Sequence, residues 1–266
     1  MNGHAWRSSQ QGCKMKNRSD AHTSRPTLQR RKAIITGGTT GIGRAIAVLL
    51  ASEGVDVFIC GRSNEHLADA LQRIHEVGKG EGVALDLADP ENIESFFDQA
   101  KSYLEKPDIV VINAAVPASA LSEMSADEIR YAVAVDFTAY LLSAKAAQEM
   151  LVDTGDIVLI GSMSAHVLGA GSTVYAGMKA GIAGFSEALR RELGPQGIKV
   201  SLVEPGKTGA DFQYPDIPSD KQREMIADET MLRAEDIAMG VHYLLTQPRR
   251  AVIQQLTISP RNQENE

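Results

Sequence analysis

The sequence predicts a single α/β domain, a doubly wound parallel sheet of about seven strands with helices on both faces. Short apolar runs rich in Val and Ile alternate with longer stretches of helical period, which is typical of parallel strands joined by crossover helices. The chain has 266 residues, 43% of them hydrophobic, and can therefore bury a full core. No internal repeat or second core is evident, so one domain is expected.

The expected strands and helices alternate from Lys32 onward. Seven apolar runs are expected to be strands, at 33–36, 55–60, 82–85, 109–112, 156–160, 199–203 and 252–258. Six stretches of helical period separate them, at 42–53, 64–77, 90–103, 126–151, 174–193 and 234–245. This order is Rossmann-like, and in such a fold ligands bind beyond the carboxyl ends of the strands.

The amino-terminal arm, residues 1–31, differs in composition from the rest of the chain. Residues 1–32 hold eight Lys or Arg and one acid, about +7, which leaves about −14 for the remainder of a chain of net charge −7. An acidic body argues against a nucleic-acid partner, whose phosphates need a basic face. The arm has few aliphatic side chains to repay its ordering entropy. We expect disorder at 1–31 and 261–266 around a domain at 32–260, with a targeting role for the arm as an open alternative.

The sequence gives little indication of a membrane-spanning segment, a metal site or disulfide bonds. No apolar stretch approaches the roughly 20 residues that span a bilayer. The two cysteines, Cys13 and Cys60, form neither a disulfide framework nor a CxxC metal pair. We therefore expect a cytoplasmic protein without a metal site and without a membrane partner.

A glycine-rich turn directly follows the first expected strand. It reads Thr36-Gly37-Gly38-Thr39-Thr40-Gly41-Ile42-Gly43, and a helix begins near Arg44. Glycines allow a tight turn and a close approach of the backbone to a pyrophosphate. The helix N-terminus supplies free N–H groups and partial positive charge for the anion. The sequence therefore predicts a dinucleotide phosphate site at this turn.

The TGxxxGxG spacing of the turn resembles the classical short-chain dehydrogenase/reductase (SDR) family. Further residues extend the resemblance from about Lys32 to about Ser259. Asp86, in Leu85-Asp86-Leu87, is similar to the family's adenine-contacting aspartate, and Asn113-Ala114-Ala115 stands where the family usually has Asn-Ala-Gly. The resemblance implies that these residues bind a nicotinamide cofactor and that the long helices form a homodimer or homotetramer.

The end of the second expected strand distinguishes between the two nicotinamide cofactors. An acid there would hydrogen-bond the ribose 2′-hydroxyl and repel a 2′-phosphate. Gly61 stands where NAD-dependent relatives carry Asp. Arg62 can give a phosphate charge-assisted, bidentate hydrogen bonds, and Ser63 adds a hydroxyl. We predict NADP(H), with a solvated surface arginine as the alternative interpretation of Arg62.

Tyr175 and Lys179 are four residues apart, which places them one turn from each other on one helix face. A free phenol has a pKa of about 10, too high for an efficient base near neutrality, and a nearby cation lowers it. Ser162 follows the expected strand 156–160, where its hydroxyl could hold a carbonyl oxygen. The resemblance implies that these three residues are catalytic and that Lys179 also binds the nicotinamide ribose.

Some residues depart from the family's pattern. Asp136 stands where the family usually has an asparagine that holds a water of the proton relay, and an acid cannot donate unless protonated. After Pro205-Gly206, which the resemblance places against the cofactor, Ala210 replaces the usual threonine, and Thr208 is a candidate substitute. The ending, 258–260, looks more like that of the branch with 3-hydroxy acid and serine dehydrogenases than that of the 3-oxoacyl carrier protein reductases.

We therefore expect an oxidoreductase that transfers a hydride between NADP(H) and a carbonyl or secondary alcohol substrate, with Tyr175 as general acid/base. A non-catalytic NADP-binding regulator and an SDR-type isomerase or dehydratase without net redox change remain open. Ser162, Tyr175 and Lys179 together argue against the regulator, and only Asp136 and Ala210 favour it. Segments 119–125 and 211–230 flank the expected site, the latter as a lid. Four side chains in or next to this lid could line an apolar pocket, with ordinary helical or loop packing as the equal alternative for each: Phe212, Tyr214, Met225 and Met231.

Overall fold

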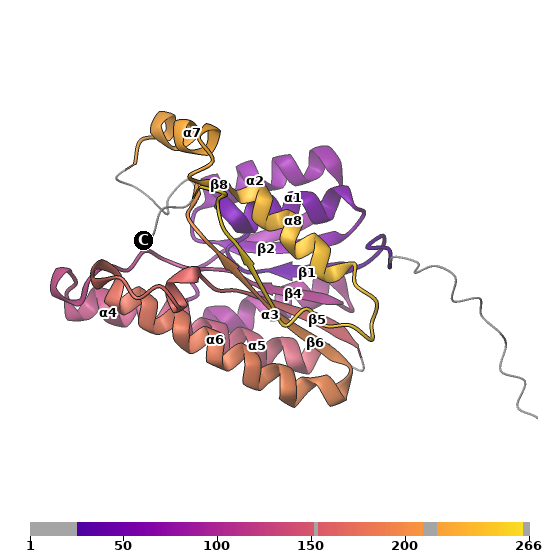
Figure 1. Ribbon diagram of the computed structural model, residues 1–266. Helices are drawn as coiled ribbons and strands as arrows, with labels where there is room; N and C mark the ends of the chain where they lie inside the picture. The colour runs from indigo at the N-terminus through magenta and orange to yellow at the C-terminus, as the bar shows by residue number, and fades with distance from the viewer. Residues whose placement is uncertain (1–25, 152–153, 210–216, 263–266) are drawn as a thin grey trace, which may run out of the picture.

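The computed structural model describes residues 26–151, 154–209 and 217–262, which form three layers with a sheet in the middle (Figure 1). Seven strands, all parallel, lie in the order β3-β2-β1-β4-β5-β6-β9. They are β1 (Lys32–Ile35), β2 (Asp56–Gly61), β3 (Lys79–Ala84), β4 (Ile109–Ile112), β5 (Gly155–Ile160), β6 (Ile198–Pro205) and β9 (Gln255–Ile258). Strand order reverses between β1 and β4, so the expected doubly wound fold is confirmed.

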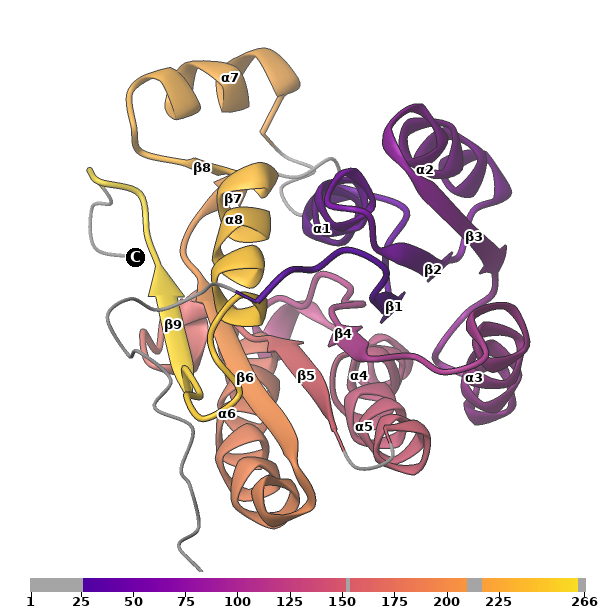
Figure 2. The same cartoon turned by 90° about the vertical axis from the view of Figure 1, so that its right-hand side faces the viewer.

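Helices cover both faces of the sheet (Figure 2). One face carries α1 (Gly41–Ser52), α2 (Asn64–Val77) and α8 (Ala234–Leu245). The other carries α3 (Pro90–Leu104), α5 (Ala139–Met150) and α6 (Thr173–Leu193). Neighbouring strand residues alternate between the two apolar layers, with Ile34 packing under α3, α5 and α6 and Ile35 under α1 and α8. The central strands β1, β4, β5 and β6 are therefore buried on both faces, which explains their apolar sequences.

The long helix expected at 126–151 is divided in two. α4 (Ala126–Val133) begins at a capping box formed by Ser125 and Glu128, and a π-helical turn, Ala134–Thr138, separates it from α5. Such a turn takes in one extra residue, and here it carries the buried Asp136, whose Oδ1 accepts a hydrogen bond from the Val116 N–H at 2.7 Å. Helical periodicity alone does not reveal this break.

Other boundaries differ for local reasons. β3 begins at Lys79, three residues earlier than expected. The apolar pattern does not show this part of the strand, because glycines stand at 80 and 82, where a side chain would clash with β2. A short pair of strands, β7 (Thr208–Gly209) with β8 (Leu232–Arg233), and the helix α7 (Ser219–Ala227) were not expected. α7 lies in the polar segment 211–230 that the sequence predicts to be a lid.

The described residues that flank the expected domain, 26–31 and 261–262, include some that contact it. Leu28 is 2% exposed and packs under α1 and α8, so the folded part begins before Lys32. The Asn262 N–H donates to the Glu229 carbonyl. Among the described residues, no helix is long and apolar enough to cross a membrane. The same residues hold no group of three or more His, Cys, Asp or Glu side chains placed to bind a metal ion.

Candidate active site

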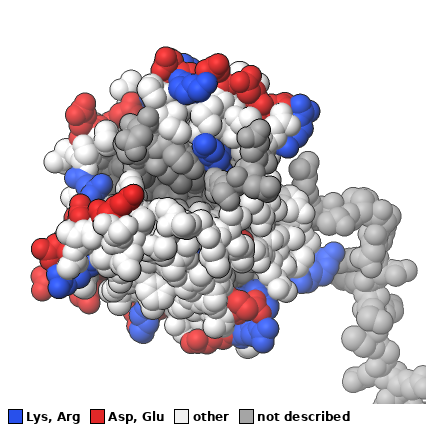
Figure 3. Space-filling model, turned by 60° about the vertical axis from the view of Figure 1, so that its left-hand side comes forward, with Lys and Arg blue, Asp and Glu red and all other residues white. Residues whose placement is uncertain are grey.

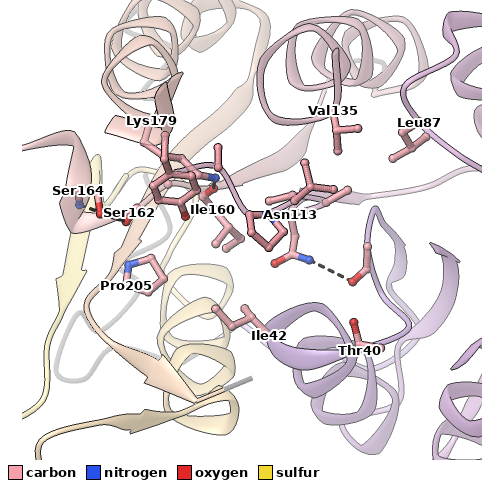
Figure 4. A pocket seen from close by; sticks show the side chains of 18 of the residues that line it. Thr40, Ile42, Leu87, Asn113, Val135, Ile160, Ser162, Ser164, Lys179 and Pro205 are labelled. Atoms are coloured by element: carbon pink, nitrogen blue, oxygen red, sulfur yellow. Dashed lines mark hydrogen bonds between the residues drawn. The ribbon is translucent and has the colours of Figure 1, made fainter. Parts of the chain in front are cut away.

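A cleft of about 990 Å³ opens at the carboxyl ends of the strands, between the glycine turn and the loop after β5 (Figure 4). The picture shows Thr40 and Ile42 on the α1 side of the cleft, with Ser162, Lys179 and Pro205 across from them. Most of the predicted site residues line this cleft: Gly37, Thr39, Thr40, Ile42, Arg62, Ser63, Asp86, Leu87, Asn113, Ala114, Ala115, Ser162, Tyr175, Lys179, Pro205 and Gly206.

Five predicted site residues lie behind the lining: Thr36, Gly41, Gly43, Asp136 and Thr208. The hydroxyl of Thr36 accepts hydrogen bonds from the N–H groups of Asn113 and Ala114 at 2.9 and 3.2 Å. That of Thr208 donates to the Gly206 carbonyl at 2.9 Å. Both threonines therefore hold neighbouring backbone in place.

The predicted apolar lid is only partly described. Ala210, Phe212 and Tyr214 lie outside the described residues. Met231 is 2% exposed, and a Cβ built on Gly209 would lie 3.1 Å from its sulfur, so the side chain packs against β7. Met225 is not among the lining residues, whereas Ile217 is.

The glycine turn is built for a close approach of backbone. Gly37 and Gly41 have φ angles of +65° and +51°, which favour glycine. A Cβ on Gly43 would lie 2.1 Å from the Gly37 carbonyl oxygen. The side-chain amide of Asn113 donates to the carbonyls of Thr36 and Gly37 at 3.2 and 3.1 Å, which joins the turn to β4. The arrangement leaves the N-terminus of α1 at the cleft without a side-chain cap, and its N–H groups could bind an anion there.

At the β2 end of the cleft, three polar side chains form a hydrogen-bonded chain. Nη1 of Arg62 donates to the hydroxyl of Tyr131 at 2.7 Å, and this hydroxyl donates to Oδ2 of Asp86 at 2.8 Å. Ser63 caps α2 by accepting from the His66 N–H at 3.3 Å. Sequence reasoning missed Tyr131, and no pattern around it indicated a role.

Three predicted catalytic residues, Ser162, Tyr175 and Lys179, line the β5 end of the cleft. Ser162 donates to Oγ of Ser164 and accepts from its N–H, both at 3.1 Å. Tyr175 lies on the first turn of α6, and Nζ of Lys179 lies 5.5 Å from the centroid of its ring. Three of the four predicted catalytic residues, Ser162, Tyr175 and Lys179, line the same cleft, whereas Asp136 is not among its lining residues. A hydroxyl, a phenol and an ammonium so arranged can hold a substrate oxygen and exchange a proton with it.

Lys179 is only 2% exposed, and its ammonium has two hydrogen-bond acceptors. Nζ donates to the Ile160 carbonyl at 3.2 Å and to the hydroxyl of Tyr140 at 3.4 Å, and it lies 5.0 Å from the centroid of the Tyr140 ring. Burial lowers the pKa of Lys179, and the charge of Asp136 opposes this shift. Sequence reasoning also missed Tyr140, although its position four residues after Asp136 was an available signal.

Asp136 lies behind Lys179 with no exposed surface. Its Oδ1 accepts the Val116 N–H, whereas the buried Oδ2 accepts no hydrogen bond from the described residues. Burial raises the pKa of Asp136 to about 6, against the opposing effects of the Lys179 charge and the Val116 N–H. The carboxyl therefore changes charge close to neutral pH, next to the lysine of the site.

Comparison with known proteins decides the family. A family model for the short chain dehydrogenases matches residues 31–219. The chain belongs to the short-chain dehydrogenase family. Its sequence is 32% identical, over 224 residues, to the 3-oxoacyl-[acyl-carrier-protein] reductase of Haemophilus influenzae, covering 82% of this chain and 91% of the relative. An uncharacterized oxidoreductase of Staphylococcus aureus is 28% identical over 236 residues, covering 88% and 98% of the two chains.

Two solved structures share the fold. One from Burkholderia cenocepacia, in complex with NADP, is 32% identical with a TM-score of 0.79 and covers 88% of this chain and 98% of its own. A blue fluorescent protein from a metagenomic library, in complex with NADPH, is 28% identical with a TM-score of 0.78 and the same coverage. The SDR resemblance stated from the motifs is thus confirmed.

Proposed function

We propose that this short-chain dehydrogenase transfers a hydride between NADP(H) and a carbonyl or secondary alcohol substrate, with Tyr175 as general acid/base. The observation that carries the proposal is the shared cleft. The glycine turn and the N-terminus of α1 line one end of this cleft, and Ser162, Tyr175 and Lys179 line the other end. The residues fit a dinucleotide because the close approach at Gly43 and the free helix N-terminus suit a pyrophosphate.

NADP(H) is favoured over NAD(H) by the residues after β2. Gly61 puts no carboxylate there to repel a 2′-phosphate, and the exposed guanidinium of Arg62 lines the same end of the cleft. Arg62 presents five N–H donors, of which Tyr131 accepts one. The complexes of structural neighbours with NADP and NADPH support the same choice.

The protein's part in the reaction is to orient groups and move a proton, while the bound nicotinamide supplies or accepts the hydride. In the direction of reduction, the hydroxyls of Ser162 and Tyr175 hydrogen-bond the carbonyl oxygen, and Tyr175 gives its proton to that oxygen. The ammonium of Lys179 stabilises the phenolate that remains. The Ile160 carbonyl and Tyr140 hold Lys179 in position for this role.

The substrate end of the cleft favours uncharged compounds. Of the charged side chains in the described lining, Arg62 and Asp86 lie at the expected adenosine end and Lys179 at the expected nicotinamide end. The remaining lining near Ser162 is small or apolar: Ala118, Ser119, Ser164, Val167, Gly169, Gly171, Ser172 and Ile217. Figure 3 shows most charged side chains along the edge of the face it presents, with a basic side chain also nearer the middle. A substrate carboxylate would find no cation in that described lining.

The test is NADPH oxidation across a panel of aldehydes and ketones, with Tyr175→Phe compared on the best substrate. Tyr175→Phe should lower kcat by roughly 100-fold or more, as loss of general acid catalysis does, and leave NADPH binding nearly unchanged. Tyr103→Phe, at an exposed tyrosine of α3, is the control and should act as wild type. Near-wild-type turnover by Tyr175→Phe would refute the assignment. NADPH binding without turnover would favour a regulator, and conversion without NADPH consumption an isomerase or dehydratase.

A further inference from the structure

The hydroxyl of Tyr131 separates a cation from a carboxylate. Tyr131 is half-buried on α4, and its hydroxyl lies between Nη1 of Arg62, at 2.7 Å, and Oδ2 of Asp86, at 2.8 Å. The Cζ atom of Arg62 lies 6.0 Å from the centroid of the Tyr131 ring, which adds a weak cation–π contact. One phenol therefore contacts both charged side chains of this end of the cleft.

Asp86 and Arg62 are held very differently. Oδ1 of Asp86 accepts from the Ala88 N–H at 3.0 Å, and its carbonyl accepts from the side chain of Asn92 at 3.0 Å, so the aspartate is fixed to its own loop. Arg62 is exposed, and Tyr131 is its single hydrogen-bond partner among the described residues. The position of the guanidinium thus depends on the phenol.

We propose that Tyr131 is a positioning residue for recognition of the cofactor's 2′-phosphate, an inference that rests on the proposed NADP(H) preference. Opposite charges this close attract each other, and without the hydroxyl the exposed arginine would pair directly with the fixed carboxylate. Such a pair would occupy the guanidinium N–H groups that a 2′-phosphate needs. With the hydroxyl in place, Arg62 keeps its other donors free. Burial and the bond to Asp86 raise the pKa of Tyr131, so the phenol keeps its proton.

The experiment measures nucleotide affinity by calorimetry, without any reaction. The probes are 2′,5′-ADP, which carries a 2′-phosphate, and 5′-AMP, which does not. We expect wild type to prefer 2′,5′-ADP about tenfold or more, as a charge-assisted bidentate contact allows, and Arg62→Ala to lose that preference. Tyr131→Phe should reduce the preference at least threefold and leave 5′-AMP affinity within about twofold. Tyr243→Phe, at an exposed tyrosine of α8, is the matched control and should match wild type.

A second variant separates the proposed mechanism from simple loss of packing. In Tyr131→Phe/Asp86→Asn the carboxylate that would capture Arg62 is gone, so the preference for 2′,5′-ADP should partly return. Three outcomes would overturn the inference about Tyr131 but leave the NADP(H) preference standing. Tyr131→Phe could keep the wild-type preference for 2′,5′-ADP, or it could lose affinity equally for both nucleotides. The double variant could also fail to recover the preference. Equal binding of the two nucleotides by wild type would overturn the NADP(H) preference and the inference together.

Discussion

A Cβ atom placed on Gly61 would lie 2.0 Å from Oγ1 of Thr39. Thr39 belongs to the glycine turn and Gly61 ends β2, so the turn itself keeps a side chain away from the position where NAD-dependent relatives carry their aspartate. The absence of an acid after β2 is therefore a packing requirement as well as an electrostatic preference.

Gly61→Ala should destabilise the protein by about 1–3 kcal/mol, because the new methyl group overpacks against Thr39. In a double-mutant cycle with Thr39→Ala, the combined loss should be smaller than the sum of the two single losses. Urea unfolding measures each free energy of unfolding. Gly184→Ala is the control, because a Cβ there meets nothing within 4 Å. Additive losses at positions 39 and 61 would show that the contact carries no strain.

Asp136→Asn should change how turnover depends on pH. The pKa of Asp136 is raised to about 6 by burial, so its carboxylate is present above that pH and helps keep Lys179 charged. Wild-type kcat/KM should fall as the pH drops through about 6, and the fall should be absent in Asp136→Asn. The pH profile of NADPH oxidation with a neutral ketone measures both. If kcat/KM of Asp136→Asn fell in the same way below about pH 6, Asp136 would have a purely structural role.

The thermal stability of wild type and of Asp136→Asn, compared across pH, provides a second test of the raised pKa of Asp136. The pKa of Asp136 is higher in the folded chain than the ordinary value of 3.8, so the protonated carboxyl favours folding, and that contribution is lost as the pH rises through about 6. The melting temperature of Asp136→Asn minus that of wild type should therefore increase between about pH 4 and pH 7. A constant difference across this range would argue against the raised pKa.

Asp156→Ala should cost about 3–5 kcal/mol, because Asp156 is 3% exposed and pairs with three cations. Its carboxylate lies 2.7 Å from Arg31, 2.9 Å from Arg249 and 3.3 Å from Lys199, which is itself 6% exposed. Asp69→Ala is the matched control and should cost about 1 kcal/mol or less, because its side chain is 43% exposed. Chemical denaturation of both variants gives the comparison. Equal losses would mean that burial does not strengthen the Asp156 network.

Ethyl 3-oxobutanoate should be reduced with a kcat/KM at least about tenfold higher than 3-oxobutanoate, because burying an unpaired carboxylate is costly. Val167→Lys places an ammonium in the cleft lining and should bring the kcat/KM for 3-oxobutanoate closer to that for its ethyl ester. Steady-state NADPH oxidation with the two compounds is the measurement. An acid that is reduced as well as its ester would contradict an uncharged substrate.

Motifs predicted the arrangement of the sheet and most of the cleft lining, because glycine turns and strand ends carry local signals. The TGxxxGxG turn placed Gly37 and Ile42 at the cleft directly. Tyr131 could not be predicted, because its role depends on a contact with Asp86, 45 residues away in sequence. The π-helical turn at Asp136 was equally hidden, since its neighbours have ordinary helical periodicity.

The π-helical turn sets the rotational phase between α4 and α5. An α-helix advances by about 100° per residue, so one inserted residue redirects every side chain beyond it. Upstream of the turn lies Tyr131, next to Arg62, and downstream lies Tyr140, next to Lys179. Removing a single residue from Ala134–Thr138 would therefore misalign the adenosine end with the nicotinamide end, even if every side chain named here were kept.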